Sequence, residues 1–111
     1  MASALIENLE KLIGTPRDGA LLRYSLGCEY LKAGQADRGI ESLREAVARD
    51  PDYSAAWKAL GRALAEHGRP QEARSAYACG IEAARRRGDR QAEKEMTVFA
   101  RRLAPKDGGG D

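Results

Sequence analysis

Residues 26–51 read LGCEYLKAGQADRGIESLREAVARDP, and residues 60–85 read LGRALAEHGRPQEARSAYACGIEAAR. The second stretch repeats the first at an interval of 34 residues. The Leu-Gly pair and a later glycine recur at identical offsets, and small or bulky residues mostly recur as small or bulky ones. A fixed period between about 20 and 50 residues is typical of proteins that stack one supersecondary unit. Because such stacks usually present a binding surface, the repeat predicts an interaction protein.

Length and composition narrow the class further. The 111 residues fit one domain, and with 32% charged residues, 5% aromatic residues and a net charge of +2 we expect a well-solvated helical protein. No run approaches the roughly 18 apolar residues of a membrane span, and the first residues lack the basic leader of a secretory signal. The isolated Cys28 and Cys79 favour a reducing compartment, so a cytoplasmic location is expected.

Helical periodicity interrupted by glycine and proline predicts an all-α protein. Six helices are expected, over residues 4–13, about 18–33, 36–49, 53–67, 70–87 and 89–103. They would form an α-solenoid of antiparallel helix pairs in a single domain, residues 1–104, with repeats at about 20–53 and 54–87. Residues 105–111 are expected to be a disordered tail.

The first and sixth helices are expected to cap the stack. The apolar stripe of the first comprises Leu5, Ile6, Leu9, Leu12 and Ile13. That of the sixth comprises Ala92, Met96, Phe99 and Leu103, and the other faces of this helix are heavily charged. One apolar and one polar face suit a helix at the end of a stack.

The two units resemble the tetratricopeptide repeat, whose pattern is Trp-x2-Leu-Gly-x2-Tyr, then Ala, an aromatic residue and Pro. The second unit matches at Trp57, Leu60, Gly61, Ala73 and Tyr77, with Leu64 in place of the first Tyr. The first unit matches at Leu26, Gly27, Tyr30, Ala46 and Pro51.

Further positions depart from the family pattern. Arg23 stands where the first unit should have Trp, and Arg85 replaces the Pro that would close the second unit. Gly39 replaces the usual Ala. Because a glycine inside a helix costs on the order of 1 kcal/mol relative to alanine, the first unit is expected to be the weaker one.

The resemblance implies a ligand groove along the first helix of each pair. Carried over position by position, the groove residues are Tyr24, Cys28, Leu31, Lys32, Ala55, Lys58, Arg62 and Glu66. Lys58 and Arg62 lie four residues apart on one helical face. They resemble half of the carboxylate clamp with which some relatives bind acidic C-terminal tails. Tyr24 and Cys28 stand where the other half would have a basic residue and an amide.

The leading hypothesis is therefore a non-enzymatic module that binds a peptide or protein surface, with no cofactor and no metal. Tyr24 and Leu31 would supply apolar contacts, while Lys58 and Arg62 would select a carboxylate. The only histidine, His67, is interpreted as a helix-terminal residue that helps satisfy carbonyl groups.

Two alternatives stay open. Uncovered apolar faces on the first or sixth helix could make the protein a self-associating scaffold, so that it is a monomer or a weak homo-oligomer. The basic segment from Arg85 to Lys94 could bind RNA or another polyanion. No aromatic residues interleave with these arginines, and acidic residues dilute the patch, which disfavours nucleic acid.

Overall fold

The computed structural model describes residues 3–105. Within that range it contains six helices and no strand, which confirms the all-α prediction. The helices are α1 (Ala4–Glu10), α2 (Ala20–Lys32), α3 (Ala36–Arg49), α4 (Ser54–Glu66), α5 (Pro70–Arg87) and α6 (Arg90–Arg102). Pairs α2–α3 and α4–α5 fall inside the two expected repeats. The limits of the domain and of its repeats stay a prediction. Apart from Pro105, the residues of the expected tail lie outside the described range.

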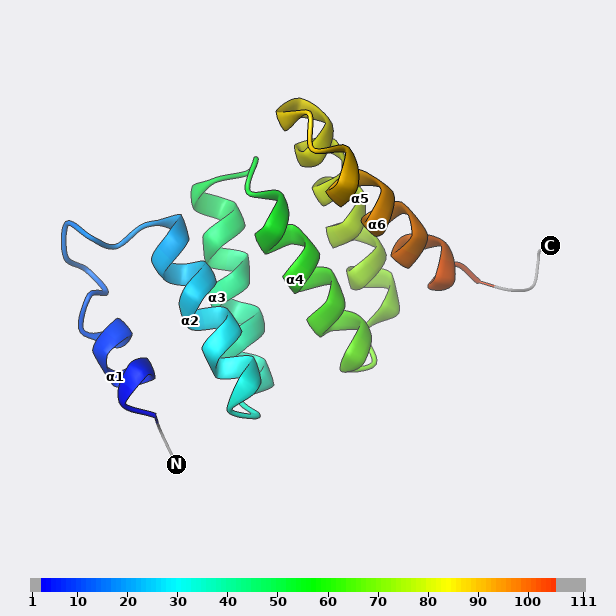
Figure 1. The fold of residues 1–111 in the computed structure, drawn as a ribbon. Coiled ribbons are helices and arrows are strands. Elements are labelled where there is room, and N and C mark those ends of the chain that lie inside the picture. Colours follow the sequence, from blue (N-terminus) through cyan, green and yellow to red (C-terminus); the bar gives the residue numbers. More distant parts are fainter. Residues whose placement is uncertain (1–2, 106–111) are drawn as a thin grey trace.

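The helices stand side by side in a row, with α1 at one end and α6 at the other (Figure 1). Besides the contacts within each pair, α3 contacts α4 and α5 contacts α6. Helix α4 also contacts both α2 and α6. We call α2, α4 and α6 the inner helices and α3 and α5 the outer helices. Helix α6 therefore occupies the position of a third inner helix.

The same turn closes the inner helix of both repeats. Gly34 and Gly68 adopt left-handed φ values of 79° and 74°. The residue after each glycine donates its N–H to a carbonyl five positions earlier, at 2.8 Å in the first repeat and 2.9 Å in the second. Glycine adopts this conformation without steric cost, which explains why it recurs at this point of the period.

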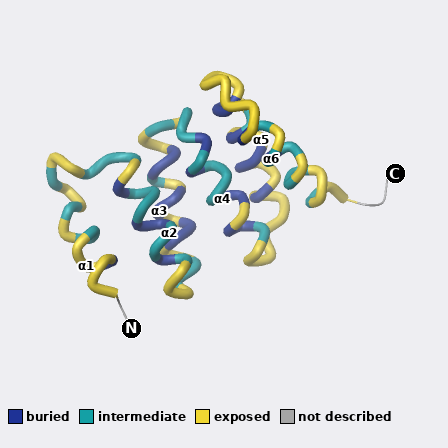
Figure 2. The backbone as a smooth tube through the Cα atoms, in the orientation of Figure 1, coloured by how far each residue is buried: buried dark blue, intermediate teal, exposed yellow. Residues whose placement is uncertain are grey.

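Most buried residues belong to α2, α3, α4 and α5, whereas α1 and α6 contribute few (Figure 2). The main core extends from α3 to α6 and includes Leu43, Leu60, Leu64, Tyr77 and Met96, each at most 3% exposed. A smaller cluster joins α1 to α2 through Ile6, Leu22, Leu26 and Tyr30. The first repeat thus faces α1 with one cluster and the rest of the stack with the other.

Glycines allow the inner and outer helices to approach closely. A Cβ added to Gly27 would lie 2.7 Å from the Cγ of Leu43, and one added to Gly61 would lie 2.5 Å from the Cε1 of Tyr77. Because neither glycine carries a side chain, the bulky residue of the outer helix covers the inner helix directly.

Arg23 stands at the position expected for tryptophan and contacts the preceding loop through a different interaction. Its guanidinium donates two hydrogen bonds of 2.9 Å to the carboxylate of Asp18, which also accepts the N–H of Gly14 at 2.9 Å. The Arg23 hydrogen bonds, followed by that from Gly14, hold the pKa of Asp18 well below its usual range. In the second repeat, Trp57 donates its indole N–H to the carbonyl of Pro51 at 2.8 Å. Both side chains tie an inner helix to the loop before it.

The expectation for α1 was wrong at its C-terminal end. The helix ends at Glu10, and Leu12 and Ile13 donate to carbonyls three residues earlier, at 3.0 and 3.1 Å. Only Ile6 of the predicted stripe is fully buried, whereas Leu5 is 49% and Ile13 42% exposed. Both side chains stay about half exposed, so the packing that would favour a longer α-helix is incomplete. The other helix ends lie within one or two residues of the prediction.

Candidate functional site

All eight groove residues inferred from the sequence line one hollow between α2 and α4, which we call the α2–α4 hollow. Its volume is about 430 Å³. The lining residues are Tyr24, Cys28, Leu31, Lys32, Ala55, Lys58, Arg62 and Glu66, together with Ala59 and Ala63. Their spacing of three and four residues places them on one face of each helix. The structure thus brings these side chains together, and their role in binding stays a prediction.

The two basic groove residues already have acidic partners. Lys58 Nζ lies 2.8 Å from Glu95 Oε1 of α6, and Arg62 Nε lies 3.0 Å from Glu66 Oε2 one turn further along α4. The Arg62–Glu66 side chains are 77% and 57% exposed. Exposed pairs of this kind contribute little free energy, so a ligand carboxylate can compete for Arg62. The Lys58–Glu95 pair bridges two inner helices.

An aromatic pair lies at the first-repeat side of the groove. The rings of Tyr24 and Tyr53 are 5.0 Å apart, centroid to centroid. Burial, followed by the nearby Cys28 thiol, raises the pKa of Tyr24, and burial also raises that of Tyr53. Both phenols therefore stay protonated near neutral pH, and Tyr24, which lines the hollow, offers a ligand uncharged aromatic surface.

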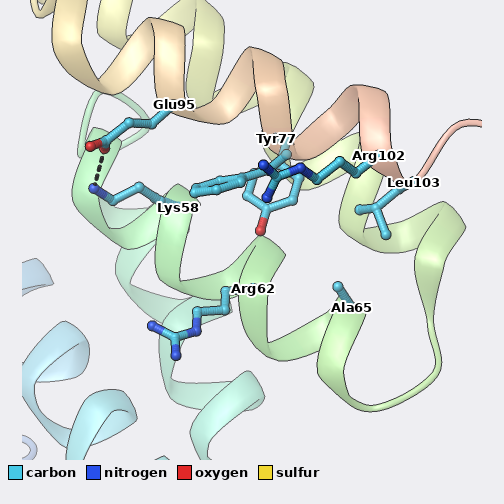
Figure 3. A pocket seen from close by; sticks show the side chains of 8 residues that line it. Lys58, Arg62, Ala65, Tyr77, Glu95, Arg102 and Leu103 are labelled. Carbon is cyan, nitrogen blue, oxygen red and sulfur yellow. Dashed lines mark hydrogen bonds and ion pairs between the residues drawn. The ribbon is translucent and has the colours of Figure 1, made fainter.

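A second hollow, between α4 and α6, was not predicted from the sequence. This α4–α6 hollow has a volume of about 450 Å³. Figure 3 shows its lining, which consists of Lys58, Arg62, Ala65, Tyr77, Glu95, Phe99, Arg102 and Leu103. Lys58 and Arg62 line both hollows, so the two cavities adjoin along α4 and extend the inner face across three helices.

The second hollow was missed because the sixth helix was interpreted only as a cap. The signal that α6 continues the series of inner helices is weak. Helix α6 begins 36 residues after α4, whereas α4 begins 34 residues after α2. Without the closing proline, α5 extends to 18 residues, against 14 in α3, which breaks the period.

Acidic side chains pair with two of the three arginines in the last turn of α5. Arg85 lies 2.8 Å from Glu93 and 2.9 Å from Glu82, and Arg86 lies 2.6 Å from Asp52. These arginines link α5 to α6 and to the loop before α4. Their pairing reduces the positive charge available to a polyanion.

The remaining chemistry-bearing residues do not converge on a site. His67 is the C-cap of α4 and its backbone N–H donates to the Ala63 carbonyl, but its imidazole has no hydrogen bond within residues 3–105. Over the same range, no three His, Cys, Asp or Glu side chains are close enough to hold a metal ion. None of the helices described combines the length and apolarity needed to span a membrane.

The fold, the paired units and the glycine contacts define a class of helical-repeat protein. The tetratricopeptide repeat family model matches residues 24–87, more than half of the chain, so the protein belongs to this family. Members of the family are in general non-catalytic adaptors that bind other proteins.

Similar proteins come from several bacteria. TPR repeat-containing protein PA0015 of Pseudomonas aeruginosa is 50% identical over 99 residues, covering 89% of this chain and 94% of its own length. The solution structure of protein BPP2914 from Bordetella parapertussis has 43% identity and a TM-score of 0.75, covering 92% of this chain and 89% of its own. A tetratricopeptide repeat domain protein from Salinibacter ruber has 33% identity and a TM-score of 0.73, covering 79% and 88%.

Proposed function

We propose that the inner face of α2, α4 and α6 binds a peptide segment of another protein and that Arg62, with Lys58 beside it, selects a carboxylate of that segment. The observation that carries the proposal is the α2–α4 hollow. Its lining combines the apolar surface of Tyr24, Leu31 and several alanines with the cationic groups of Lys58 and Arg62. Arginine can bind a carboxylate through two hydrogen bonds, and lysine adds a point charge.

The two cations contribute unequally. Arg62 needs only to leave the exposed Glu66, whereas Lys58 would have to leave Glu95, which also accepts a hydrogen bond from Gln91 at 3.0 Å. We therefore assign the main carboxylate contact to Arg62. Neither role involves catalysis, and the free Cys28 and Cys79 are compatible with a cytoplasmic location.

Peptides selected from a displayed random library on the wild-type protein test this function. For a selected acidic peptide, the double variant Lys58→Ala/Arg62→Ala should bind at least about tenfold more weakly, because charge-assisted hydrogen bonds are lost. The matched control Arg74→Ala/Lys94→Ala removes one arginine and one lysine from exposed positions outside both hollows. If the groove variant bound the peptide as tightly as the control, the groove assignment would be wrong.

Self-association is a second candidate, favoured by the end of the molecule that carries α1. Leu21 is 68% exposed there, and Leu5 and Ile13 are 49% and 42% exposed. Apolar side chains that remain exposed at the end of a stack can pair between copies of the chain. Sedimentation at increasing protein concentration separates the two candidates, since a monomer at high micromolar concentration excludes the scaffold.

A further inference from the structure

The α4–α6 hollow contains a polar group delivered from the outer layer. Tyr77 belongs to α5, yet its ring crosses α4 over Gly61, where an added Cβ would lie only 2.5 Å from the ring. Its hydroxyl points into the hollow (Figure 3). In the first repeat the equivalent contact is made by Leu43, which packs over Gly27 and has no polar atom in its side chain. This hydroxyl is therefore specific to the second repeat.

The charges of the α4–α6 hollow favour an anionic ligand. Lys58, Arg62 and Arg102 are its three cations, and Glu95 is the single carboxylate in its lining. Glu95 is already engaged by Lys58 and Gln91. Within residues 3–105, Arg102 forms no ion pair, and its side chain extends from α6 across the hollow (Figure 3). A carboxylate of the ligand would supply the missing partner.

The walls of this hollow are apolar. Phe99 packs against the Tyr77 ring, with centroids 5.7 Å apart, and Leu103 and Ala65 add aliphatic surface. Ala65 stands where the first repeat has Leu31, so space that a leucine would fill stays open. A volume of about 450 Å³ lies within the range of roughly 300–1,000 Å³ of small-ligand pockets. It accommodates one bulky apolar side chain with a carboxylate next to it.

We propose that the α4–α6 hollow is a specificity pocket for a bulky apolar residue of the bound peptide, and that Arg102 and the Tyr77 hydroxyl bind the carboxylate of an adjacent Asp or Glu. The inference rests on the proposed function, because the same peptide continues into the α2–α4 hollow past Lys58 and Arg62. The chemistry that the pocket selects is an apolar–acidic pair of neighbouring residues.

Both polar groups suit this role near neutral pH. Burial raises the pKa of Tyr77, so its hydroxyl remains a hydrogen-bond donor. The guanidinium of Arg102 presents a planar set of donors that matches a carboxylate, whereas a lysine at this position would keep the charge but lose the bidentate geometry. Arg102→Lys is therefore expected to bind with intermediate affinity.

The peptide library used above also tests the pocket. Peptides selected on the wild type are expected to share a Leu, Ile, Met or Phe next to Asp or Glu. Their affinities are then measured by fluorescence polarisation for Arg102→Gln and for its matched control Arg101→Gln, which lies outside both hollows. We expect a loss of at least about tenfold for Arg102→Gln, because a charge-assisted hydrogen bond is removed, and an unchanged affinity for the control.

A double-mutant cycle identifies the contact. Changing the acid of the peptide to its amide should weaken binding to the wild type by at least about tenfold but have little further effect on Arg102→Gln. Tyr77→Phe, which keeps the ring over Gly61, should weaken binding of the acid more than binding of the amide, because the amide oxygen accepts only an uncharged and weaker hydrogen bond. Additive effects in both cycles would overturn the proposal.

Variants that fill one hollow at a time with a larger side chain test this inference independently of the proposed function. Ala65→Leu narrows the α4–α6 hollow, Ala55→Leu narrows the α2–α4 hollow, and Ala48→Leu is a control at an exposed position of α3. Circular dichroism establishes that each variant folds. Selected peptides that lack the apolar–acidic pair and lose affinity only with Ala55→Leu would overturn the pocket and leave the proposed function standing. A library from which no peptide is enriched would overturn both.

Discussion

In the first repeat Leu31 of α2 packs onto Gly39 of α3, where an added Cβ would lie 2.7 Å from the leucine Cγ. In the second repeat the same two positions hold Ala65 and Ala73. The first repeat therefore combines a large with a very small side chain, and the second combines two small ones. Leu31 occupies space on the inner face, whereas Ala65 leaves the α4–α6 hollow open. The departure of Gly39 from the family pattern is thus matched by a change in its neighbour.

The contact in which an outer-helix side chain covers an inner-helix glycine differs in the opposite sense, because here the second repeat has the larger side chain. Leu43 covers Gly27 in the first repeat, and the longer Tyr77 covers Gly61 in the second. Of these two residues, only Tyr77 brings a hydroxyl to the inner face. At this pair of equivalent positions, two repeats with one backbone plan therefore cover the inner-helix glycine with different groups, an aliphatic side chain in the first and an aromatic ring with a hydroxyl in the second.

Gly61→Ala should have the largest effect on stability. Its new methyl group would meet the rigid, buried Tyr77 ring, and we expect destabilisation toward the upper end of the roughly 1–3 kcal/mol of an overpacked core. Urea unfolding measures the change. The control is Gly19→Ala, where no heavy atom lies within 4 Å of the added Cβ. Equal stabilities of the two variants would contradict the tight contact.

Gly39→Ala should have a smaller effect, because better helix propensity, worth on the order of 1 kcal/mol, offsets part of the clash with Leu31. We expect a net loss of about 1 kcal/mol. In the double variant Gly39→Ala/Leu31→Ala, which copies the second repeat, the clash is relieved, so the two effects should be non-additive by about 1 kcal/mol. Additivity in urea unfolding would show that the two positions do not act as a unit.

The loop before α2 supplies a test by pH. Because the folded-state pKa of Asp18 is depressed, its bond to Arg23 stabilises the protein above the ordinary aspartate pKa of about 3.9. This stabilisation is lost as the pH falls below that value. Asp18→Asn should therefore unfold at lower urea than the wild type at pH about 7, and the difference should shrink in acid. The control Asp37→Asn changes an exposed carboxylate of α3.

The smallest expected effect concerns Lys58. Glu95→Gln removes its ionic partner, so an acidic peptide from the library should bind roughly two- to fivefold more tightly, as expected for a partly exposed pair. Glu93→Gln removes a carboxylate from the same helix outside both hollows and should leave the affinity unchanged. Equal gains in the two variants would indicate a general charge effect instead of a contact at Lys58.

Much of the fold follows from sequence because its signals are local. Glycines at fixed offsets end helices, and apolar residues three and four apart mark buried faces, so five of the six helices have nearly the expected bounds. The expected end of helix α1 was wrong because helix length depends on packing, and Leu5 and Ile13 are only about half buried. The eight groove residues could be predicted because residues three or four apart lie on the same face of any α-helix.

The partners of those side chains could not be predicted in the same way. The ion pair between Lys58 and Glu95 and the position of Arg102 depend on how α6 is rotated against α4. Helix α6 packs on α5 where the Met96 thioether covers Gly80, a contact between residues that no helical periodicity relates. The 34-residue period ends before α6, so no matching position of an earlier unit indicates it.

The single tryptophan of the chain makes one part of the molecule visible by fluorescence. Trp57 holds the start of α4 to the Pro51 carbonyl, and its Cβ faces Gly80 of α5. Its emission therefore reports on the junction between the two repeats and on the second repeat. Three of the four tyrosines, Tyr24, Tyr30 and Tyr53, lie within residues 20–53, so the tyrosine signal comes mainly from the first repeat. Excitation of tryptophan alone, compared with excitation of both residue types, would follow the separation of the repeats during unfolding without any attached dye.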